Sequence, residues 1–409
     1  MIVLLNIKQC VAYSVFPIFK GSPKFPVLET FLSYGVFFYR SLSYFCATAA
    51  GAAAKYDSRH KNDKFMKTKF LFACALAALL GAGEAIPCSR IVFHGKDNLT
   101  LVGRTLDWKT PIPTNLYVYP RGMKKQGMPD GNTLRWVSKY GSVLAVSYDG
   151  GVTEGMNEKG LVMNALFCKG SIYRSAVDNS TTTMSLAVFI SYFLDNFATV
   201  DEVENWLTGS DFAIYGQNFD QGTEAALHWA VTDPSGTTLV MEYQNGELNL
   251  YKSDDYDVLT NDPPFDKMLA IDNYWQGIGG DKMLPGTVRS PDRFARASFF
   301  IRHIPTDVDG KTAAAAVLSV LGQVSVPLGY ELEDAPNLSS TQWRSIADTK
   351  NTIYYFGFTT ELANFWIDLG KLDLSKGAPV LKLDTSDKTG LEGCVNGLLK
   401  KSGPFNPMW

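Results

Sequence analysis

Cys88 is the residue whose surroundings in the sequence point most directly to chemistry. It follows an apolar segment typical of exported proteins, and only Ile86 and Pro87 separate it from a small-residue site that ends at Ala85. When processing exposes Cys88 as the first residue, one residue supplies both a thiol and a free α-amine. The amine has an ordinary pKa of about 7.7 to 8.0, so it can accept the thiol proton near neutral pH without a histidine. We therefore expect nucleophilic chemistry by an N-terminal cysteine.

The segment before this cysteine has the three parts of a signal peptide. Residues 66–69 (Met-Lys-Thr-Lys) are basic, residues 70–80 are apolar, and residues 83–85 (Gly-Glu-Ala) form a small-x-small cleavage site. This pattern predicts a signal peptide over residues 66–85, with translation beginning near Met66. The expected location of the mature chain is the periplasm or the exterior of a bacterium, with no stable membrane insertion after processing.

The residues on either side of the predicted signal peptide are interpreted separately. Residues 1–65 have no amphipathic periodicity or turn punctuation and are interpreted as a non-native extension. Residues 86–87 form a short remnant, which attack of the Cys88 thiol on the preceding carbonyl could remove. A lipid-anchored or secreted binding protein without turnover is the alternative from another functional class, with Cys88 acylated in the anchored form. Pro87 and Glu84, close before the cysteine, argue against a lipid-attachment site.

Composition excludes several classes of partner. The 409 residues carry a net charge of −3 with acidic and basic residues interspersed, so no polybasic surface is expected for nucleic acid or an anionic membrane. Six cysteines are present, and three of them lie before the predicted mature terminus. The other three are an odd number, so at least one thiol stays free even in an oxidising compartment. Cys88 is the expected free thiol, whereas Cys168 and Cys394 are expected to be small buried apolar residues.

Strands are expected directly after Cys88. Two short segments, residues 90–94 and 99–104, flank a Gly-Lys-Asp-Asn turn, which predicts a β-hairpin. The geometric consequence is that the hairpin can return Arg104 and Asp107 alongside Cys88.

The rest of this region alternates between blocks of strands and blocks of helices. The expected strands are residues 116–119, 136–140, 143–147, 161–167, 227–232, 238–243, 248–251, 352–358 and 365–369, and the expected helices are residues 184–196, 199–207, 292–303 and 312–323. Paired hairpins in the order β, α, β, α, β predict an α+β fold, in which two antiparallel sheets stack face to face with helices on their outer faces. Because no linker or repeat follows Cys88, residues 88–409 are expected to form one domain.

Six short runs, in one order across this region, carry a resemblance to a known family. The runs are residues 88–90 (CSR), 103–108 (GRTLDW), 155–161 (GMNEKGL), 228–236 (HWAVTDPSG), 259–263 (LTNDP) and 290–294 (SPDRF). With them the sequence resembles the choloylglycine hydrolase family of linear amide C–N hydrolases, which includes bile salt hydrolases and penicillin V acylases. The resemblance implies a four-layer αββα fold of the N-terminal-nucleophile hydrolases, a small-molecule amide substrate, no cofactor and a homotetramer.

The resemblance also implies a role for each of five residues. Cys88 matches the nucleophile, whose thiolate attacks a secondary amide and forms a thioester that water hydrolyses. Asp107 matches the carboxylate that binds the α-amine, and Arg104 matches the arginine that places positive charge near the sulfur. Asn261 matches the amide donor of the oxyanion hole. Arg293 matches the second arginine, which completes the charge network behind the nucleophile.

One position departs from the family's pattern. The family carries Asn, Tyr or, in a Gram-negative branch, Trp at the place of Phe167, a residue that lines the site. Phe167 keeps an aromatic wall, and a backbone N–H of Phe167 or Cys168 could still serve the oxyanion. Trp108 and Asn164 also resemble the Gram-negative branch, whose members cleave penicillin V and N-acyl homoserine lactones. We expect Trp108, Phe167 and Asn164 to contact the substrate, and an aromatic- or fatty-acyl amide to be preferred over the alternative, a conjugated bile salt.

Each of these residues taken alone would have a simpler interpretation. A lone Arg or Asp on a hairpin is commonly a surface ion pair, and Asn-Asp-Pro alone is typical of a turn. His94, His228 and His303 lack the spacing of a metal site, so all three are interpreted as structural and no metal is expected.

Overall fold

The first two strands form the predicted hairpin, and Cys88 lies at its open end. β1 (Ser89–Gly95) and β2 (Leu99–Trp108) pair antiparallel, with Arg90 opposite Arg104. A short 3-10 turn joins the two strands. Both strands are almost fully buried, so the hairpin is a central element of the molecule rather than an edge.

The computed structural model describes four stretches of the chain, which are residues 88–178, 180–216, 225–331 and 339–409. The predicted extension, signal peptide and remnant all lie outside the described residues. The described residues belong to one compact unit. Among them, no helix has the length and apolar character needed to cross a membrane.

The β1–β2 hairpin belongs to a seven-stranded sheet. All neighbouring strands in it pair antiparallel except β17 and β19, which are parallel. The order across the sheet is β14 (Val258–Leu259), β1, β2, β15 (Ser340–Asp348), β16 (Ile353–Phe358), β17 (Phe365–Asp368) and β19 (Gly393–Cys394).

A second sheet of nine antiparallel strands faces the first. Its order is β13 (Glu247–Ser253), β12 (Thr238–Gln244), β11 (Leu227–Thr232), β8 (Val162–Phe167), β7 (Gly151–Asn157), β6 (Ser142–Ser147), β3 (Thr114–Tyr119), β18 (Val380–Leu383) and β20 (Lys400–Ser402). Two small sheets join β4 (Lys124–Gln126) to β5 (Arg135–Val137) and β9 (Thr183–Ser185) to β10 (Ala213–Tyr215).

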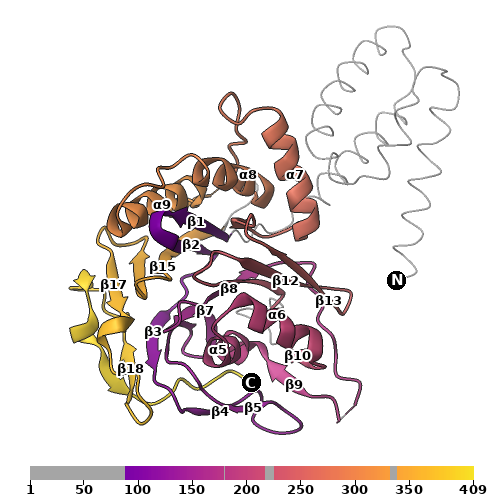
Figure 1. Ribbon diagram of the computed structural model, residues 1–409, viewed down its shortest axis with the longest axis vertical. Helices are drawn as coiled ribbons and strands as arrows, with labels where there is room; N and C mark the ends of the chain where they lie inside the picture. Colours follow the sequence, from indigo (N-terminus) through magenta and orange to yellow (C-terminus); the bar gives the residue numbers. More distant parts are fainter. Residues whose placement is uncertain (1–87, 179, 217–224, 332–338) are drawn as a thin grey trace, which may run out of the picture. The chain divides into compact units, whose positions relative to one another are not determined.

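Helices cover the outer faces of both large sheets. α8 (Ser290–Ile301) and α9 (Gly310–Val324) pack on the β1–β2 side, and α7 (Phe265–Gly277) packs on α8 (Figure 1). α5 (Leu186–Asn196) and α6 (Val200–Gly209) cover the nine-stranded sheet. These layers confirm the predicted αββα arrangement of an α+β fold.

Buried apolar side chains hold the layers together. Val102 and Trp343 of the seven-stranded sheet meet Val118 and Met156 of the nine-stranded sheet in the layer between the sheets. Separate apolar layers lie beneath the helices on each side. The central strands of each sheet, such as β2, β6 and β8, are therefore buried on both faces and mostly apolar, whereas the outer strands β13 and β20 keep exposed positions.

Helix starts follow from the local sequence. The Ser185 hydroxyl accepts the N–H of Ala187 at the beginning of α5, and the Thr199 hydroxyl accepts the N–H of Glu202 at the beginning of α6. The Glu202 carboxylate in turn accepts the N–H of Ala198. These N-caps fix the first turns, as the Thr-Val-Asp-Glu pattern predicts.

Several elements, β7, α7 and β15 among them, were not predicted, and one predicted strand is shorter than expected. β7 has two glycines and an acid, which weaken a strand pattern, and α7 has little apolar periodicity. β15 was also absent from the prediction. The strand expected over residues 136–140 ends at Val137, because the N–H groups of Lys139 and Tyr140 donate to the carbonyl oxygen of Asp195 at the end of α5.

The expectation that Cys394 is buried is wrong. It lies on the short edge strand β19 and is exposed, whereas Cys88 and Cys168 are buried. All three thiols are free. An edge strand of two residues cannot cover its own side chains, which accounts for the difference.

Candidate active site

Cys88 is buried directly before β1, with 4% of its surface exposed. Its Sγ lies 3.8 Å from Nη2 of Arg104 and 3.8 Å from the main-chain oxygen of Asp107. Antiparallel pairing brings these groups together, because Ser89 lies opposite Thr105 on β2. The guanidinium places a positive charge beside the sulfur.

Arg104 and Asp107 leave β2 on opposite faces, because they are three residues apart on a strand. Arg104 points toward the nine-stranded sheet, where Nη1 lies 3.0 Å from Oε2 of Glu154 and Nη2 donates to the carbonyl oxygen of Ala165 at 2.9 Å. Burial acts to lower the pKa of Arg104, but the charges of Glu154 and Cys88 raise it overall. The guanidinium is therefore charged and fixed beside the sulfur.

Glu154 is the buried acid that holds Arg104, and the sequence analysis did not single it out. The hydroxyls of Ser345 and Tyr354 donate to its Oε1, and Asn164 Nδ2 donates to its Oε2 at 3.0 Å. Every group around the carboxylate thus donates a hydrogen bond. The available signal was an acid on a buried strand, directly before the Gly-Met-Asn run that resembles the family.

Asn164 belongs to this buried network, and the structure does not bring it to the cavity beside Cys88. Its Oδ1 accepts from Nε of Arg90 at 2.8 Å, while its Nδ2 donates to Glu154. Because both ends of the amide are occupied by buried charged groups, Asn164 aligns the network behind Arg104. The expected contact of Asn164 with the substrate is not supported by this position.

Asp107 is fully buried on the face of β2 where Arg293 of α8 lies. Its Oδ2 accepts from the Thr105 hydroxyl at 3.2 Å, and its Oδ1 has no hydrogen-bond partner among the described residues. Burial raises the pKa of Asp107 to about 6, against the opposing charge of Arg293. A buried acceptor without a donor is costly, so this oxygen marks a place that a further N–H would stabilise.

Asn261 and Arg293 hold the backbone of Cys88 from the side of α8. The N–H of Cys88 donates to Oδ1 of Asn261 at 2.6 Å, and Nη2 of Arg293 donates to the same oxygen at 2.7 Å. Nη1 of Arg293 donates to the main-chain oxygen of Cys88 at 2.5 Å. Burial lowers the pKa of Arg293 to about 10, so it stays charged at neutral pH. The other four predicted catalytic residues therefore lie around Cys88, with Arg104 beside its sulfur and Asn261 and Arg293 on its backbone.

The expected contact between the α-amine and Asp107 is not made while the Pro87–Cys88 peptide bond is intact. The peptide nitrogen of Cys88 carries one hydrogen, and Asn261 accepts it. Cleavage of the bond would give the nitrogen additional hydrogens. Oδ1 of Asp107 is a buried acceptor without a donor among the described residues, so it is available to accept one of them.

The donors expected for an oxyanion differ in their availability. Nδ2 of Asn261 donates to the main-chain oxygen of Phe167 at 2.7 Å, which leaves its second hydrogen for another acceptor. The N–H of Cys168 donates to the carbonyl oxygen of Ala226, so that proposed donor is already used. Because hydrogen-bonded pairs alternate along antiparallel strands, the N–H of Phe167 points away from β11, on the same side as its carbonyl.

A largely apolar cavity, open to solvent, leads to Cys88. Trp108 and Phe167 meet edge to face in its wall, with ring centroids 6.2 Å apart. Arg104 and Asp107 are the charged residues among its described lining, and both are buried beside the thiol. The apolar lining comprises Leu106, Trp108, Ile112, Val152, Ala165, Phe167, Leu186, Ala187, Ala225, Leu227 and Met408.

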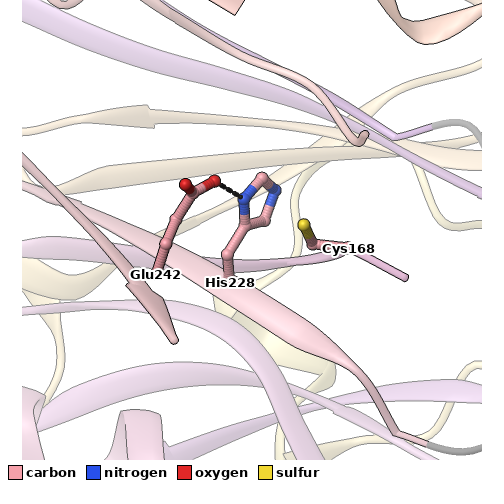
Figure 2. Close-up of side chains that lie close together, drawn as sticks. All are labelled: Cys168, His228 and Glu242. Atoms are coloured by element: carbon pink, nitrogen blue, oxygen red, sulfur yellow. Dashed lines mark hydrogen bonds and ion pairs between the residues drawn. The ribbon is translucent and has the colours of Figure 1, made fainter. Parts of the chain in front are cut away.

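Cys168, His228 and Glu242 form the one group of donor atoms, among the described residues, with the spacing to reach a common metal ion. Figure 2 shows the imidazole between the carboxylate and the sulfur. Nδ1 lies 2.6 Å from Oε1 of Glu242, whereas two ligands of a tetrahedral zinc at 2.0–2.1 Å would be about 3.3 Å apart. Nε2 lies 2.7 Å from the main-chain oxygen of Thr260. Both ring nitrogens have hydrogen-bond geometry, which fits an ion pair better than a metal centre.

Two facing sheets between helix layers, with a buried cysteine at the start of the first described strand, define the class of N-terminal-nucleophile hydrolases. The family model of linear amide C–N hydrolases, choloylglycine hydrolase family, matches residues 88–389, so the match begins at Cys88. The chain belongs to the choloylglycine hydrolase family and is an enzyme that hydrolyses linear amide C–N bonds.

Named relatives agree with this assignment. The chain is 35% identical to a penicillin V acylase of Pectobacterium atrosepticum over 370 residues, which cover 84% of this chain and 98% of the relative. It is 27% identical to a bile salt hydrolase/transferase of Clostridium perfringens, covering 70% and 94% of the two chains. The solved structure of penicillin V acylase from Agrobacterium tumefaciens superposes with a TM-score of 0.73 at 42% identity, covering 78% of this chain and 99% of that one.

Proposed function

We propose that the chain is an exported amidohydrolase that cleaves a secondary amide with an apolar acyl group, of the penicillin V or N-acyl homoserine lactone type. The thioester forms on Cys88 after processing frees its α-amine. The observation that carries this proposal is the position of the Cys88 thiol, which opens into an apolar cavity and has Arg104 3.8 Å from its sulfur.

The geometry supports a two-step reaction. The sulfur of Cys88 attacks the carbonyl carbon of the amide, and the thiol proton passes to the α-amine, which Asp107 holds. The oxygen that becomes negative is stabilised by Nδ2 of Asn261 and the N–H of Phe167. The α-ammonium then protonates the leaving nitrogen as the C–N bond breaks, which gives a thioester and a free amine. Water, activated by the same α-amine, hydrolyses the thioester and regenerates the thiol.

The cavity supports an apolar acyl group. Its exposed lining is aliphatic and aromatic, with Trp108 and Phe167 placed for an aromatic or alkyl chain. The relatives at 35% and 42% identity are named penicillin V acylases, whereas the relative named bile salt hydrolase/transferase is 27% identical. A conjugated bile salt, which carries hydroxyl groups on its steroid, is the alternative substrate.

Two observations support export and processing at Cys88. The alignment with the Pectobacterium acylase takes up 84% of this chain, more than the part from Cys88 onward can supply, so it extends into the predicted signal peptide. Cys88 is also buried, with hydrogen bonds to its backbone N–H and carbonyl oxygen. A lipid-anchored cysteine would need an exposed terminus, so this position disfavours the lipid-anchored alternative.

Processing is tested by mass spectrometry of the purified, active protein. Cys88 should be the first residue, and an active enzyme that keeps Ile86 and Pro87 would contradict the mechanism. Palmitate incorporation at Cys88 would instead support the lipid-anchored alternative. Light scattering of the same sample tests the homotetramer.

Substrate class is tested by a hydrolysis panel of penicillin V, N-acyl homoserine lactones, glycocholate and taurocholate. Penicillin V or the homoserine lactones should be cleaved at the higher kcat/KM. Cys88→Ala should abolish all hydrolysis, whereas Cys394→Ala, which removes an exposed thiol on an edge strand, should retain it. Preference for the conjugated bile salts would overturn the proposed substrate class, and full activity of Cys88→Ala would overturn the thioester.

A further inference from the structure

A buried ion pair lies next to the segment that carries Asn261. His228 on β11 and Glu242 on β12 are at most 1% exposed, and Cys168 lies on the other side of the imidazole (Figure 2). None of the three lines the cavity. The proposed reaction does not use their side chains either.

The contacts of His228 define its charge. A main-chain carbonyl can only accept a hydrogen bond, so Nε2, 2.7 Å from the oxygen of Thr260, carries a hydrogen. Nδ1, 2.6 Å from the carboxylate of Glu242, carries another. Burial acts to lower the pKa of His228, but Cys168 and Glu242 raise it well above the ordinary value. His228 is therefore an imidazolium that donates in two directions.

His228 and Glu242 form hydrogen bonds with the two ends of one short segment, residues 260–265. His228 binds the carbonyl oxygen of Thr260, directly before Asn261. The second carboxylate oxygen of Glu242 accepts the N–H of Phe265, the first residue of α7, at 2.9 Å. Asn261 lies between these two anchor points.

The middle of the segment is held by other elements. The N–H of Asn261 donates to the hydroxyl of Ser290 on α8 at 2.8 Å. Asp262 accepts the N–H of Lys169 at 3.2 Å, and the Cys168 thiol lies 3.8 Å from the same carboxylate. The Asn261 side chain emerges from this fixed backbone with its oxygen on the N–H of Cys88 and its nitrogen on the carbonyl of Phe167.

We propose that His228 and Glu242 are positioning residues of the active site, which hold residues 260–265 so that the carboxamide of Asn261 stays between Cys88 and Phe167. The inference rests on the proposed use of Asn261 as an oxyanion donor. A buried ion pair is often no more stabilising than apolar residues of the same volume. The directional hydrogen bonds of this pair to two backbone groups fix the position of the segment, which apolar packing alone cannot do.

Two substitutions at one position separate positioning from packing. In His228→Gln the amide nitrogen can take the place of Nε2 and keep the bond to Thr260, whereas in His228→Asn it takes the place of Nδ1 and keeps only the bond to Glu242. Both remove the same charge. We expect kcat to fall about 10- to 100-fold in His228→Asn and clearly less in His228→Gln, with KM little changed in both. Equal losses of kcat, or losses in KM alone, would overturn the proposal.

Glu242 provides a second pair if the His228 variants fail to fold. Glu242→Gln keeps an oxygen for the N–H of Phe265 and an NH₂ group for Nδ1, whereas Glu242→Met keeps neither. Glu242→Met should lose more kcat than Glu242→Gln, and the opposite order would contradict positioning. His94→Asn, which alters an exposed histidine paired with Asp257, is the control and should match the wild type.

Crystal structures of the same variants give a readout that needs no substrate. In His228→Asn the bond from Nδ2 of Asn261 to Phe167 should lengthen or break, and in His228→Gln it should remain. An unmoved Asn261 in both variants would overturn the positioning role even if every substrate is cleaved. A displaced Asn261 with no amide cleaved by the wild type would instead remove only the proposed function.

Discussion

At the scale of single residues, the site depends on charges that are buried and almost completely partnered. Arg104 is held by Glu154, and Arg293 by the oxygen atoms of Cys88 and Asn261. Asp107 differs, because one of its oxygens has no donor while the chain before Cys88 is intact. In the proposed mechanism the same carboxylate is a source of instability before processing and the acceptor of the α-amine after it.

We predict that Asp107→Asn has a pH-dependent effect on the free energy of unfolding. The background is a Cys88→Ala chain, which cannot free its α-amine through the thiol. Burial raises the pKa of Asp107 from 3.8 to about 6, so the native state binds this proton more tightly than the unfolded state. The stability that this group contributes is complete below about pH 4 and is lost as pH rises through about 6. At pH 7 the Asn variant should be more stable by about 3 kcal/mol, and at pH 4 the two should agree.

Urea unfolding at both pH values measures this difference. The comparison between the two chains removes the contribution of other titrating groups. An Asn variant whose advantage is the same at pH 4 and pH 7 would show that Asp107 titrates normally in the folded chain.

Glu154→Gln tests the buried pair that holds Arg104. The two side chains are 2% and 1% exposed, and removal of one charge from such a pair typically costs about 3–5 kcal/mol. The guanidinium would also lose its fixed position beside the sulfur, so kcat/KM should fall at least tenfold. Unfolding free energy and steady-state kinetics measure the two effects.

An exposed pair provides the matched control for that experiment. Asp307→Asn removes a carboxylate 2.8 Å from Lys96, where the side chains are 80% and 59% exposed. The expected loss is below about 1 kcal/mol, with no change in kinetics. Equal effects of the two substitutions would show that burial does not determine the role of Glu154.

At the scale of elements, the strands and helices that could be predicted are those with local signals in the sequence. The hairpin of β1 and β2 follows from two apolar segments around a turn, and the beginning of α6 follows from the Thr199 capping box. Cys88 and the four residues around it came from the motifs of a family rather than from periodicity. Glu154 and Glu242 were not singled out, and His228 was interpreted only as structural, because the contacts of all three residues join distant segments of the chain.

Close packing of β2 against α9 predicts the effect of a single methyl group. A Cβ at Gly103 would lie 2.7 Å from Cγ1 of Val317 on α9, which is too close for an unchanged core. Gly103→Ala should therefore cost about 1–3 kcal/mol, and Val317→Ala in the same chain should recover part of that loss. Urea unfolding of the single and double variants measures the coupling.

A glycine on the opposite side of the same helix provides the control. Gly322 in α9 is exposed, and a Cβ there would meet no atom within 4 Å. Gly322→Ala should stabilise the chain by about 0.5–1 kcal/mol through helix propensity alone. Destabilisation by both alanines would mean that α9 itself, rather than its contact with β2, is sensitive.

At the scale of the whole molecule, the last residues of the chain return to the cavity near the first strand. Phe405 packs edge to face on Tyr117 and Tyr119, and its N–H donates to the Tyr119 hydroxyl at 2.9 Å. The N–H of Met408 donates to the carbonyl oxygen of Gly150 at 2.9 Å. Two anchor points thus place the Met408 side chain in the cavity wall.

This placement predicts that Met408 limits the size of the acyl group. Met408→Ala removes part of the wall, so kcat/KM should rise for longer acyl chains relative to short ones, by a few-fold to about tenfold. Met408→Trp fills the same space and should shift the ratio in the opposite direction. Hydrolysis of a series of N-acyl homoserine lactones of increasing chain length measures this ratio, and Met283→Ala, a methionine that is 55% exposed and absent from the cavity wall, should leave it unchanged. If neither substitution at Met408 changes the ratio, the acyl chain does not reach the C-terminal residues.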